Sequence, residues 1–483
     1  MKYSSKTVAN SLAIKFFEQL SVKLTSLIVS IVLARILDVT EFGVVGILTV
    51  FVHIASSIIE GGLSTSLIQK KKVDDLDYST VFYTSFGLAV VLYLVLFVSA
   101  PFIAEQYENE AIVRYLRVIG VMLFVTPFNT VQLGYVYKHM LFKRLLLSTL
   151  VASIVSGLIG ILMATKGFGA WSLVVQTILN SSVSVVMLLF LVHWRPKLLF
   201  SFQKLKEHFS YGWKLLVSSI LDTLYNEMRS LVIGKRYTVD DLSYYNRGDS
   251  YPKTIMTSLN TSVQTVMFPV LSAEQDNPEQ MKEVMRKTVA LSSYVVFPVM
   301  AGFAAVADSF VRLILTDKWL PCVPYLQLAC IIYAIQPINS CNLQAIKAIG
   351  RSDIFLIIDL IKKGLGFLIL FVSAFAFKTP MAIAISAALY APVQLVINAY
   401  PNSKMIHYSF FEQINDIAIP MVMSVIMFVC VSLLNNLNIR LSIRTILQIG
   451  VGVGVYVLLS ITLKVPAMSI VISRLKTLLG RKQ

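Results

Sequence analysis

Charged side chains occur inside long apolar stretches of this sequence, where they are costly and therefore informative. Lys15 and Glu18 lie in one such stretch, and Lys214, Asp222 and Arg229 lie in another. At about 100° per residue, the members of each group share one face of a helix. An ionisable group in a lipid-spanning helix costs a few kcal/mol, so it normally faces a polar interior. These residues are predicted to line a cavity within a membrane.

Further ionisable residues are candidates for the same cavity. Glu60 closes the second apolar stretch, and Asp359, Lys362 and Lys363 fall in a later one at i,i+3 and i,i+4 spacing. Structural interpretations stay open beside the functional one. Lys15 and Lys214 are close enough to helix ends for their ammonium groups to reach lipid head groups. The charges at 359–363 can also simply pair with one another.

Cavity groups of these types suit a phosphorylated, sugar-bearing cargo. Lys and Arg hold phosphate or diphosphate. Carboxylates can titrate or bind a cation, so Na+ or H+ is a possible coupling ion, and hydroxyl groups can satisfy sugar hydroxyls. The sequence has no P-loop and no Gly-x-Ser-x-Gly motif, and its four cysteines form no CxxC pair. We therefore expect neither an enzyme nor a bound metal or cofactor.

The composition indicates which elements must position these side chains. Of 483 residues, 56% are hydrophobic and 14% charged, whereas soluble proteins have about 25% charged residues. A spanning helix needs roughly 17–25 apolar residues, which predicts an all-α integral membrane protein of about fourteen transmembrane helices. The predicted helices cover residues 12–36, 43–63, 79–104, 112–136, 145–165, 169–193, 211–236, 252–272, 287–316, 322–346, 353–377, 379–400, 414–435 and 443–463. Residues 237–252 are expected to form a loop.

The basic residues predict the orientation of these helices. Lysine and arginine gather in alternate connections, for example at Lys70 to Lys72 and at Arg195 to Lys206, and again in the tail from Arg474 to Lys482. By the positive-inside rule both termini are cytoplasmic. The net charge of +16 therefore reflects contact with membrane lipids, because no nucleic-acid recognition motif accompanies it.

The chain also contains an internal repeat. Tyr115-Leu-Arg followed by Thr126-Pro-Phe-Asn129 returns as Tyr325-Leu-Gln followed by Gln336-Pro-Ile-Asn339. The copies are about six helices apart, so the two halves share one orientation, as in carriers whose two lobes enclose a central cavity. The predicted parts are an N-terminal lobe of six helices (1–200), a C-terminal lobe of six helices (201–405) and two additional helices with a basic tail (406–483).

Several motifs in a fixed order resemble a known transporter family. They are Leu33-Ala-Arg-Ile-Leu37 with Glu41-Phe-Gly43, Glu60-Gly-Gly-Leu63, Tyr244-Tyr-Asn246, Phe268-Pro-Val-Leu-Ser272, Lys318-Trp319 and Ala345-Ile-Lys-Ala-Ile-Gly-Arg351. Over roughly residues 5 to 430 the chain is similar to the polysaccharide exporter and flippase family of the multidrug/oligosaccharidyl-lipid/polysaccharide superfamily. Within this family the chain resembles the colanic-acid or teichuronic-acid exporter branch.

This resemblance implies a function and a location. The function is alternating-access translocation of undecaprenyl-pyrophosphate-linked oligosaccharides across the bacterial inner membrane, for lipopolysaccharide, capsule or exopolysaccharide assembly. Partners would be the lipid-linked cargo, membrane lipids, and the polysaccharide polymerase and glycosyltransferase machinery. The main alternative is a cation-coupled multidrug exporter of the same superfamily, which would favour a cavity with few cationic groups. A glycan polymerase would need a large outer loop, and the predicted outer loops are too short for one.

Overall fold

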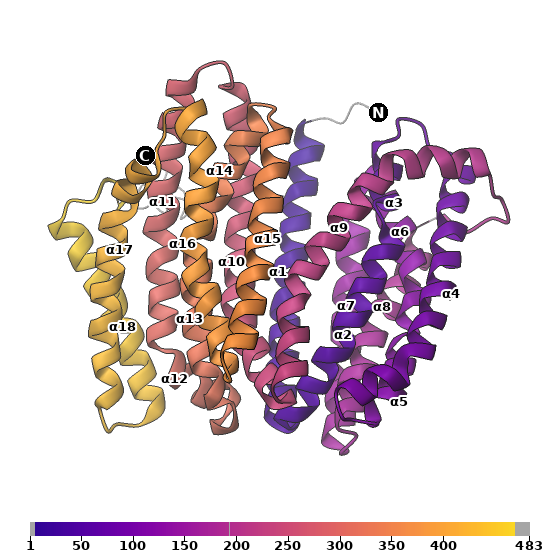
Figure 1. Ribbon diagram of the computed structural model, residues 1–483, viewed down its shortest axis with the longest axis horizontal. Helices are drawn as coiled ribbons and strands as arrows, with labels where there is room; N and C mark the ends of the chain where they lie inside the picture. Colours follow the sequence, from indigo (N-terminus) through magenta and orange to yellow (C-terminus); the bar gives the residue numbers. More distant parts are fainter. Residues whose placement is uncertain (1–4, 193, 469–483) are drawn as a thin grey trace. The chain divides into compact units, whose positions relative to one another are not determined.

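The computed structural model describes residues 5–192 and 194–468, and among them every regular element is a helix. The helices divide into two compact units, residues 1–243 (unit 1) and 244–483 (unit 2) (Figure 1). The basic tail residues from Arg474 to Lys482 lie outside the described residues. An all-helical fold satisfies every backbone group within each segment, which lipid requires of an open chain.

Unit 1 is a bundle of long helices packed side by side. Helix α1 packs against α7, α7 against α8, and α6 against α2, α3, α4 and α8, while α9 packs along α2, α3 and α4. The helices are α1 (Ser5–Ile36), α2 (Val39–Glu60), α3 (Leu63–Gln69), α4 (Asp75–Gln106), α5 (Ala111–Ile119), α6 (Met122–Lys138), α7 (Phe142–Thr165), α8 (Ala170–Leu191) and α9 (Phe202–Arg236).

Helix α10 (Val239–Ala273) leads from unit 1 into unit 2. In unit 2, α11 packs against α13, α14 and α17, α16 packs against α13, α14 and α15, and α18 packs against α17. The helices are α11 (Pro278–Ala305), α12 (Ala307–Phe310), a π-helical turn (Val311–Leu315), a 3-10 turn (Asp317–Cys322), α13 (Val323–Ala334), α14 (Gln336–Ala348), α15 (Ser352–Ala376), α16 (Pro380–Met405), α17 (Phe410–Leu433), a second 3-10 turn (Leu434–Asn436) and α18 (Leu441–Thr462).

Within the described residues, 11 helical segments are long and apolar enough to cross a membrane. Three other long helices, α9, α10 and α15, do not meet that criterion. Polar and ionisable side chains interrupt their apolar character, including Lys214 and Asp222 on α9 and Lys362 and Lys363 on α15. Helices of this kind suit positions facing a polar interior rather than lipid.

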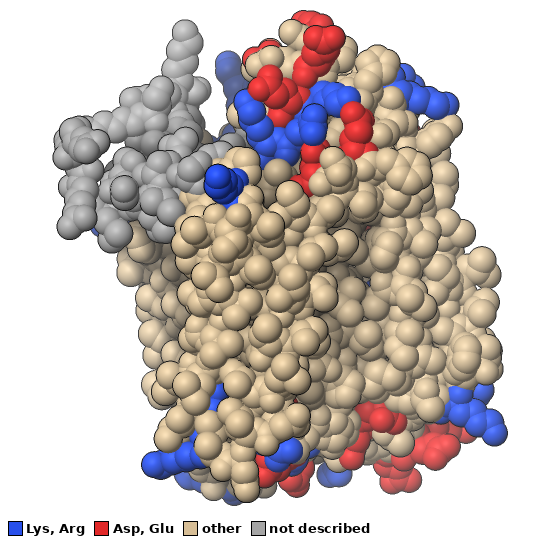
Figure 2. Space-filling model, turned by 90° about the vertical axis from the view of Figure 1, so that its left-hand side faces the viewer, with Lys and Arg blue, Asp and Glu red and all other residues tan. Residues whose placement is uncertain are grey.

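The surface charges of unit 2 are concentrated at its two ends (Figure 2). On the face drawn there, lysine, arginine, aspartate and glutamate gather at two ends, and the belt between them carries almost none. One end has the α11–α17 ion pairs Lys282–Glu412 and Arg286–Asp416, both at 2.7 Å. The other has Arg312 and Arg444, each 3.1 Å from Asp308. An uncharged belt between charged ends is the arrangement that a lipid bilayer selects.

The expected loop at 237–252 is wrong. Helix α10 begins at Val239 and continues through this polar stretch. The start is fixed locally, because Thr238 Oγ1 accepts a 3.0 Å hydrogen bond from the Asp241 backbone N–H and donates to the Asp241 carboxylate. Acidic side chains at Asp240 and Asp241 also favour the positive end of the helix dipole. Polarity was therefore a poor guide to helix boundaries here.

Two predicted helices are each built from two pieces. The predicted helix 112–136 is α5 and α6, separated at Gly120 and Val121, and the predicted helix 322–346 is α13 and α14, separated at Ile335. These breaks occur in the segments that carry the repeated Tyr-Leu and Pro-x-Asn motifs. The same two-piece construction thus appears once in each unit.

Candidate functional site

A polar cavity lies inside unit 1 among α1, α6, α7 and α8. Its volume is about 310 Å³, within the range of roughly 300–1,000 Å³ typical of small-ligand pockets. Each of the four helices contributes at least one hydrogen-bonding side chain. The lining residues are Lys15, Glu18, Val22, Asn129, Leu133, Tyr137, Leu145, Thr149, Ala152, Asn180, Ser181 and Ser184. We call this the α1 cavity.

An ion pair from α1 occupies one wall of the α1 cavity. Lys15 Nζ lies 2.6 Å from Glu18 Oε2, one helical turn away, and Thr149 Oγ1 donates a 3.2 Å hydrogen bond to Glu18 Oε1. Glu18 is 6% exposed, whereas the Lys15 ammonium faces the Tyr137 ring at 5.6 Å from its centroid. Burying a carboxylate requires a paired cation and hydrogen bonds, and both are present. Lys15 and Glu18 therefore lie together at the α1 cavity, and their role in binding stays a prediction.

The opposite wall is made of neutral polar groups. Asn129 belongs to α6, and Asn180, Ser181 and Ser184 belong to α8. Within the part of the chain that the structure describes, Asn129, Ser181 and Ser184 have no hydrogen-bonding side-chain partner, while Ser156 Oγ approaches Asn180 Oδ1 at 3.5 Å. These amide and hydroxyl groups remain available to a ligand or to water.

The predicted site residues of α9 do not line the α1 cavity. Lys214 and Asp222 are exposed on α9, and Arg229 is half-buried with its guanidinium 5.5 Å from the Tyr225 ring centroid. They lie on the polar face of α9, and this polarity is the reason that α9 does not meet the criterion for an apolar membrane span. Their membership of a common cavity with Lys15 and Glu18 stays a prediction.

The remaining predicted residues lie at separate places. Glu60 is the exposed last residue of α2. In unit 2, Lys363 Nζ on α15 pairs with Asp359 Oδ2 at 2.6 Å, one turn away, and Lys363 is 8% exposed. Lys362 is half-buried, and its carbonyl accepts a 2.7 Å hydrogen bond from Tyr390 of α16. The sequence had left mutual pairing open for this set, and the Asp359–Lys363 pair takes that form.

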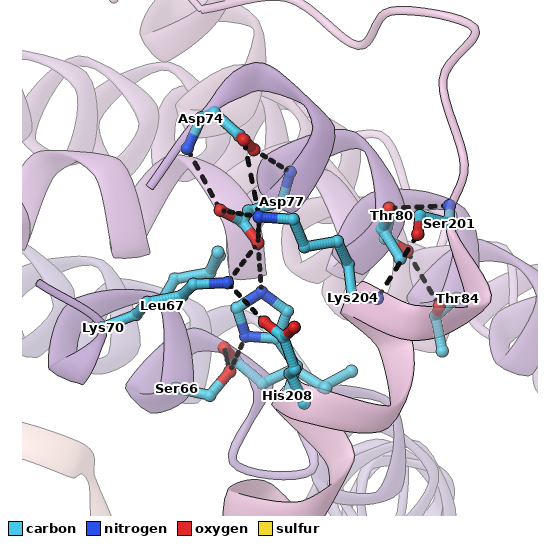
Figure 3. A network of polar contacts seen from close by, with 12 residues as sticks. Ser66, Leu67, Lys70, Asp74, Asp77, Thr80, Thr84, Ser201, Lys204 and His208 are labelled. Atoms are coloured by element: carbon cyan, nitrogen blue, oxygen red, sulfur yellow. Dashed lines mark hydrogen bonds and ion pairs between the residues drawn. The ribbon is translucent and has the colours of Figure 1, made fainter. Parts of the chain in front are cut away.

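Sequence reasoning missed a second polar cluster, at the end of unit 1 where α3, α4 and α9 meet (Figure 3). Its centre is Asp77, which is fully buried. His208 Nε2 lies 3.2 Å from Asp77 Oδ1, and His208 Nδ1 lies 2.9 Å from Ser66 Oγ. A carboxylate only accepts, so Nε2 carries a proton, while Ser66 Oγ donates a 2.7 Å hydrogen bond to the Leu63 carbonyl oxygen.

Two lysines complete this cluster, which we call the Asp77 cluster. Lys70 Nζ lies 2.7 Å from Asp77 Oδ1 and 2.8 Å from Glu207 Oε2, and Lys204 Nζ lies 3.1 Å from Asp77 Oδ1. Burial opposes the charge on Lys70, but the two carboxylates outweigh it and raise the pKa of Lys70. Burial lowers the pKa of His208 from 6.5, although Asp77 opposes the shift. The lysines had been assigned to loops, so only the burial of Asp77 reveals the cluster.

An apolar hollow of about 480 Å³ lies in unit 2 among α10, α11, α17 and α18. Val299, Phe303, Val453 and Val457 are among its walls, and Gly302 and Gly452 leave space on two of its helices. Gln448 and Tyr456 supply its polar side chains. We call it the α18 hollow.

The chain is similar to proteins of polysaccharide biosynthesis. A profile of the polysaccharide biosynthesis protein family matches residues 32–324, and the chain belongs to this family. The match with the teichuronic acid biosynthesis protein TuaB of Bacillus subtilis (strain 168) is 25% identical and covers 63% of each chain. The match with the lipopolysaccharide biosynthesis protein WzxC of Escherichia coli (strain K12) is 24% identical over 76% of this chain and 74% of WzxC.

Among solved structures, the chain is similar to the lipid II flippase MurJ in an inward closed conformation. The TM-score is 0.74, and the match covers 94% of this chain and 99% of MurJ at 14% identity. This likeness establishes the fold. The chain therefore has the fold of MurJ and belongs to a polysaccharide biosynthesis family, and 11 helical segments in its described part could cross a membrane.

Proposed function

We propose that this protein is a flippase that moves undecaprenyl-pyrophosphate-linked oligosaccharides across the bacterial inner membrane by alternating access. The observation that carries the proposal is the α1 cavity, which places a buried ion pair and unused amide and hydroxyl groups inside a bundle of apolar spans. Such groups are costly in a membrane unless they meet a polar cargo. Membership of a polysaccharide biosynthesis family points to a glycan as that cargo.

The proposed transport unit has about fourteen spans. They are the apolar spans together with α9, α10 and α15, arranged as two six-helix lobes with α17 and α18 added, and both termini are cytoplasmic. In this arrangement, cations on the polar helix α9, Lys214 and Arg229, hold the diphosphate. The α18 hollow takes part of the polyprenyl chain, because its walls are almost wholly apolar.

Coupling to an ion gradient belongs to the same proposal. The chain has no P-loop, so Na+ or H+ exchange at a buried carboxylate such as Glu18 would drive the cycle. The polysaccharide polymerase and glycosyltransferases are the proposed partners. The glycosyltransferases supply the unit that is flipped, and the polymerase receives it. Uphill transport in sealed vesicles with all ion gradients collapsed would contradict the coupling.

The test is depletion of the protein in its own host with mass spectrometry of the extracted lipids. We expect undecaprenyl-diphosphate oligosaccharides to accumulate while one surface polymer disappears, and Asp222→Asn or Arg229→Gln to reproduce the effect. Unchanged lipid intermediates together with accumulation of small cationic compounds would instead establish the multidrug exporter.

A further inference from the structure

The charge of the α1 cavity sets what it can hold. Among the lining residues that the structure describes, Lys15 is the only cation and Glu18 the only anion, and the 2.6 Å contact neutralises both. A diphosphate needs a net positive site or several free donors on cationic side chains. The described lining offers neither, so the diphosphate of the cargo belongs elsewhere.

The remaining lining groups have a different chemistry. Two amides, from Asn129 and Asn180, and three aliphatic hydroxyls, from Thr149, Ser181 and Ser184, face the cavity, and the Tyr137 ring lies beside them. A side-chain amide offers a donor and an acceptor next to each other, which matches adjacent hydroxyls on a sugar ring. A cavity of about 310 Å³ has room for a monosaccharide but not for a whole repeat unit.

The burial pattern also favours a neutral polar ligand. An apolar drug would leave the free groups of Asn129, Ser181 and Ser184 without partners, which is unfavourable for polar groups shielded from water. The α1 cavity has no phenylalanine or tryptophan among its lining residues, whereas the α18 hollow has Phe303 and is almost wholly apolar. The two sites therefore suit opposite ends of an amphipathic cargo.

We propose that the α1 cavity is a glycosyl-recognition subsite that reads one sugar of the cargo through Asn129, Ser181 and Ser184, and not the diphosphate. This inference rests on the proposed function. It adds the place in the structure at which selectivity between glycans is determined. Asn129 of α6 and Ser184 of α8 are the specificity-determining residues. The Lys15–Glu18 pair orients Thr149 and supplies further hydrogen bonds without adding net charge.

The test measures two affinities on the full-length protein in lipid nanodiscs by native mass spectrometry. The probes are undecaprenyl diphosphate and the same lipid carrying one glucose, galactose, N-acetylglucosamine or N-acetylgalactosamine. Wild-type protein is expected to bind at least one glycosylated lipid several-fold more tightly than the bare lipid. Asn129→Ala and Ser184→Ala should each reduce that ratio by about twofold to tenfold, as loss of one hydrogen bond does, while leaving the affinity for the bare lipid unchanged.

Matched variants control this experiment. Ser182→Ala lies on α8 beside Ser181 but outside the cavity lining, so it should leave the ratio unchanged. Ser181→Ala provides a further cavity variant if Asn129→Ala lowers the melting temperature. Survival of the full ratio in all three cavity variants, or a wild-type ratio of one, would place the sugar elsewhere and overturn the inference.

Two other outcomes have distinct meanings. If wild-type protein binds neither bare nor glycosylated lipid, the proposed function itself fails, and the inference falls with it. If radioactive Na+ binds to wild-type protein and not to Glu18→Gln, while the cavity variants leave the lipid ratio intact, the α1 cavity is a cation site and the sugar subsite is refuted.

Discussion

At Lys15 and Glu18, two opposite charges stabilise each other within a helix that would otherwise face lipid or apolar neighbours. Lys15 reaches partial solvent, with 21% of its side chain exposed, while 8% of the Glu18 side chain is exposed. Removing one member leaves the other with no counter-charge, and removing both leaves only a small cavity. The pair therefore behaves as a unit.

The difference between removing one charge and removing both gives the first prediction. Glu18→Gln alone and Lys15→Met alone should each destabilise the protein by roughly 1–3 kcal/mol, less than the ~3–5 kcal/mol of a fully buried pair because Lys15 is partly exposed. The double variant should lose less than the sum of the two. Thermal unfolding in nanodiscs measures all three, and strict additivity would show that the two charges do not interact.

At the scale of elements, one close contact in unit 1 lies where α2 ends and α9 passes. Gly61 and Gly62 adopt positive φ values of +41° and +71° and join α2 to α3. A Cβ on Gly62 would lie 2.8 Å from both the Gly212 carbonyl oxygen and Leu215 Cβ. Glycine therefore permits both the left-handed turn and the close approach of α9.

Gly62→Ala should cost about 2–4 kcal/mol. Left-handed strain accounts for ~1–2 kcal/mol and the clash with α9 for the rest. Gly167→Ala is the matched control, since its φ is +79° but the space around its Cβ is open, so only the strain remains. Thermal unfolding of the two variants separates the terms, and equal losses would mean that α9 is not held tightly at Gly212.

The Asp77 cluster gives a pH-dependent prediction for α9. Buried His208 has a pKa below 6.5, whereas the unfolded chain accepts a proton near 6.5. The stability that neutral His208 contributes is therefore fully present above pH 6.5 and is lost as the pH falls below it, by at most ~1.4 kcal/mol per pH unit. Amide hydrogen exchange at residues 202–212, corrected for intrinsic rates, should quicken between pH 7 and pH 5.

Two variants test whether His208 causes the pH-dependent exchange of α9. His208→Gln should remove the pH dependence, while Lys197→Ala, which breaks an exposed pair with Asp75, should leave it intact. An unchanged pH profile in His208→Gln would assign the loosening of α9 to groups other than His208.

The fold was largely predictable from sequence, and the sites were only partly so. Apolar runs of sufficient length located most helices, because lipid admits few alternatives. Helical periodicity placed Lys15 and Glu18 on one face because both belong to one helix, while their role in a site stays a prediction. It could not bring Asn129 and Ser184 to the same cavity, because that depends on how α6 and α8 pack. The Asp77 cluster was missed for the same reason: Ser66, Asp77 and His208 come from three elements.

On the scale of the whole molecule, the chain separates polar from apolar binding surfaces. The α1 cavity belongs to unit 1 and the α18 hollow to unit 2. A cargo with a sugar end and a polyprenyl end needs both kinds of surface, whereas a small drug needs one. The two sites therefore make a joint prediction: damage to either should block transport of the lipid-linked glycan.

Filling the α18 hollow tests the part of this claim that involves α17 and α18. Gly302→Leu places an isobutyl group among the hollow's walls, where the nearest atom to a new Cβ is Met427 Cε at 3.5 Å. The longer side chain occupies the hollow, and leucine improves the helix propensity of α11 by about 0.8–1.0 kcal/mol. Folding should therefore persist while the lipid chain loses its site. We expect lipid-linked intermediates to accumulate in cells with normal amounts of the protein.

Gly454→Leu is the matched control. Gly454 lies on α18 but outside the hollow and has open space at its Cβ, so this variant should transport normally. Normal transport by a folded Gly302→Leu protein would exclude the hollow as the site of the polyprenyl chain.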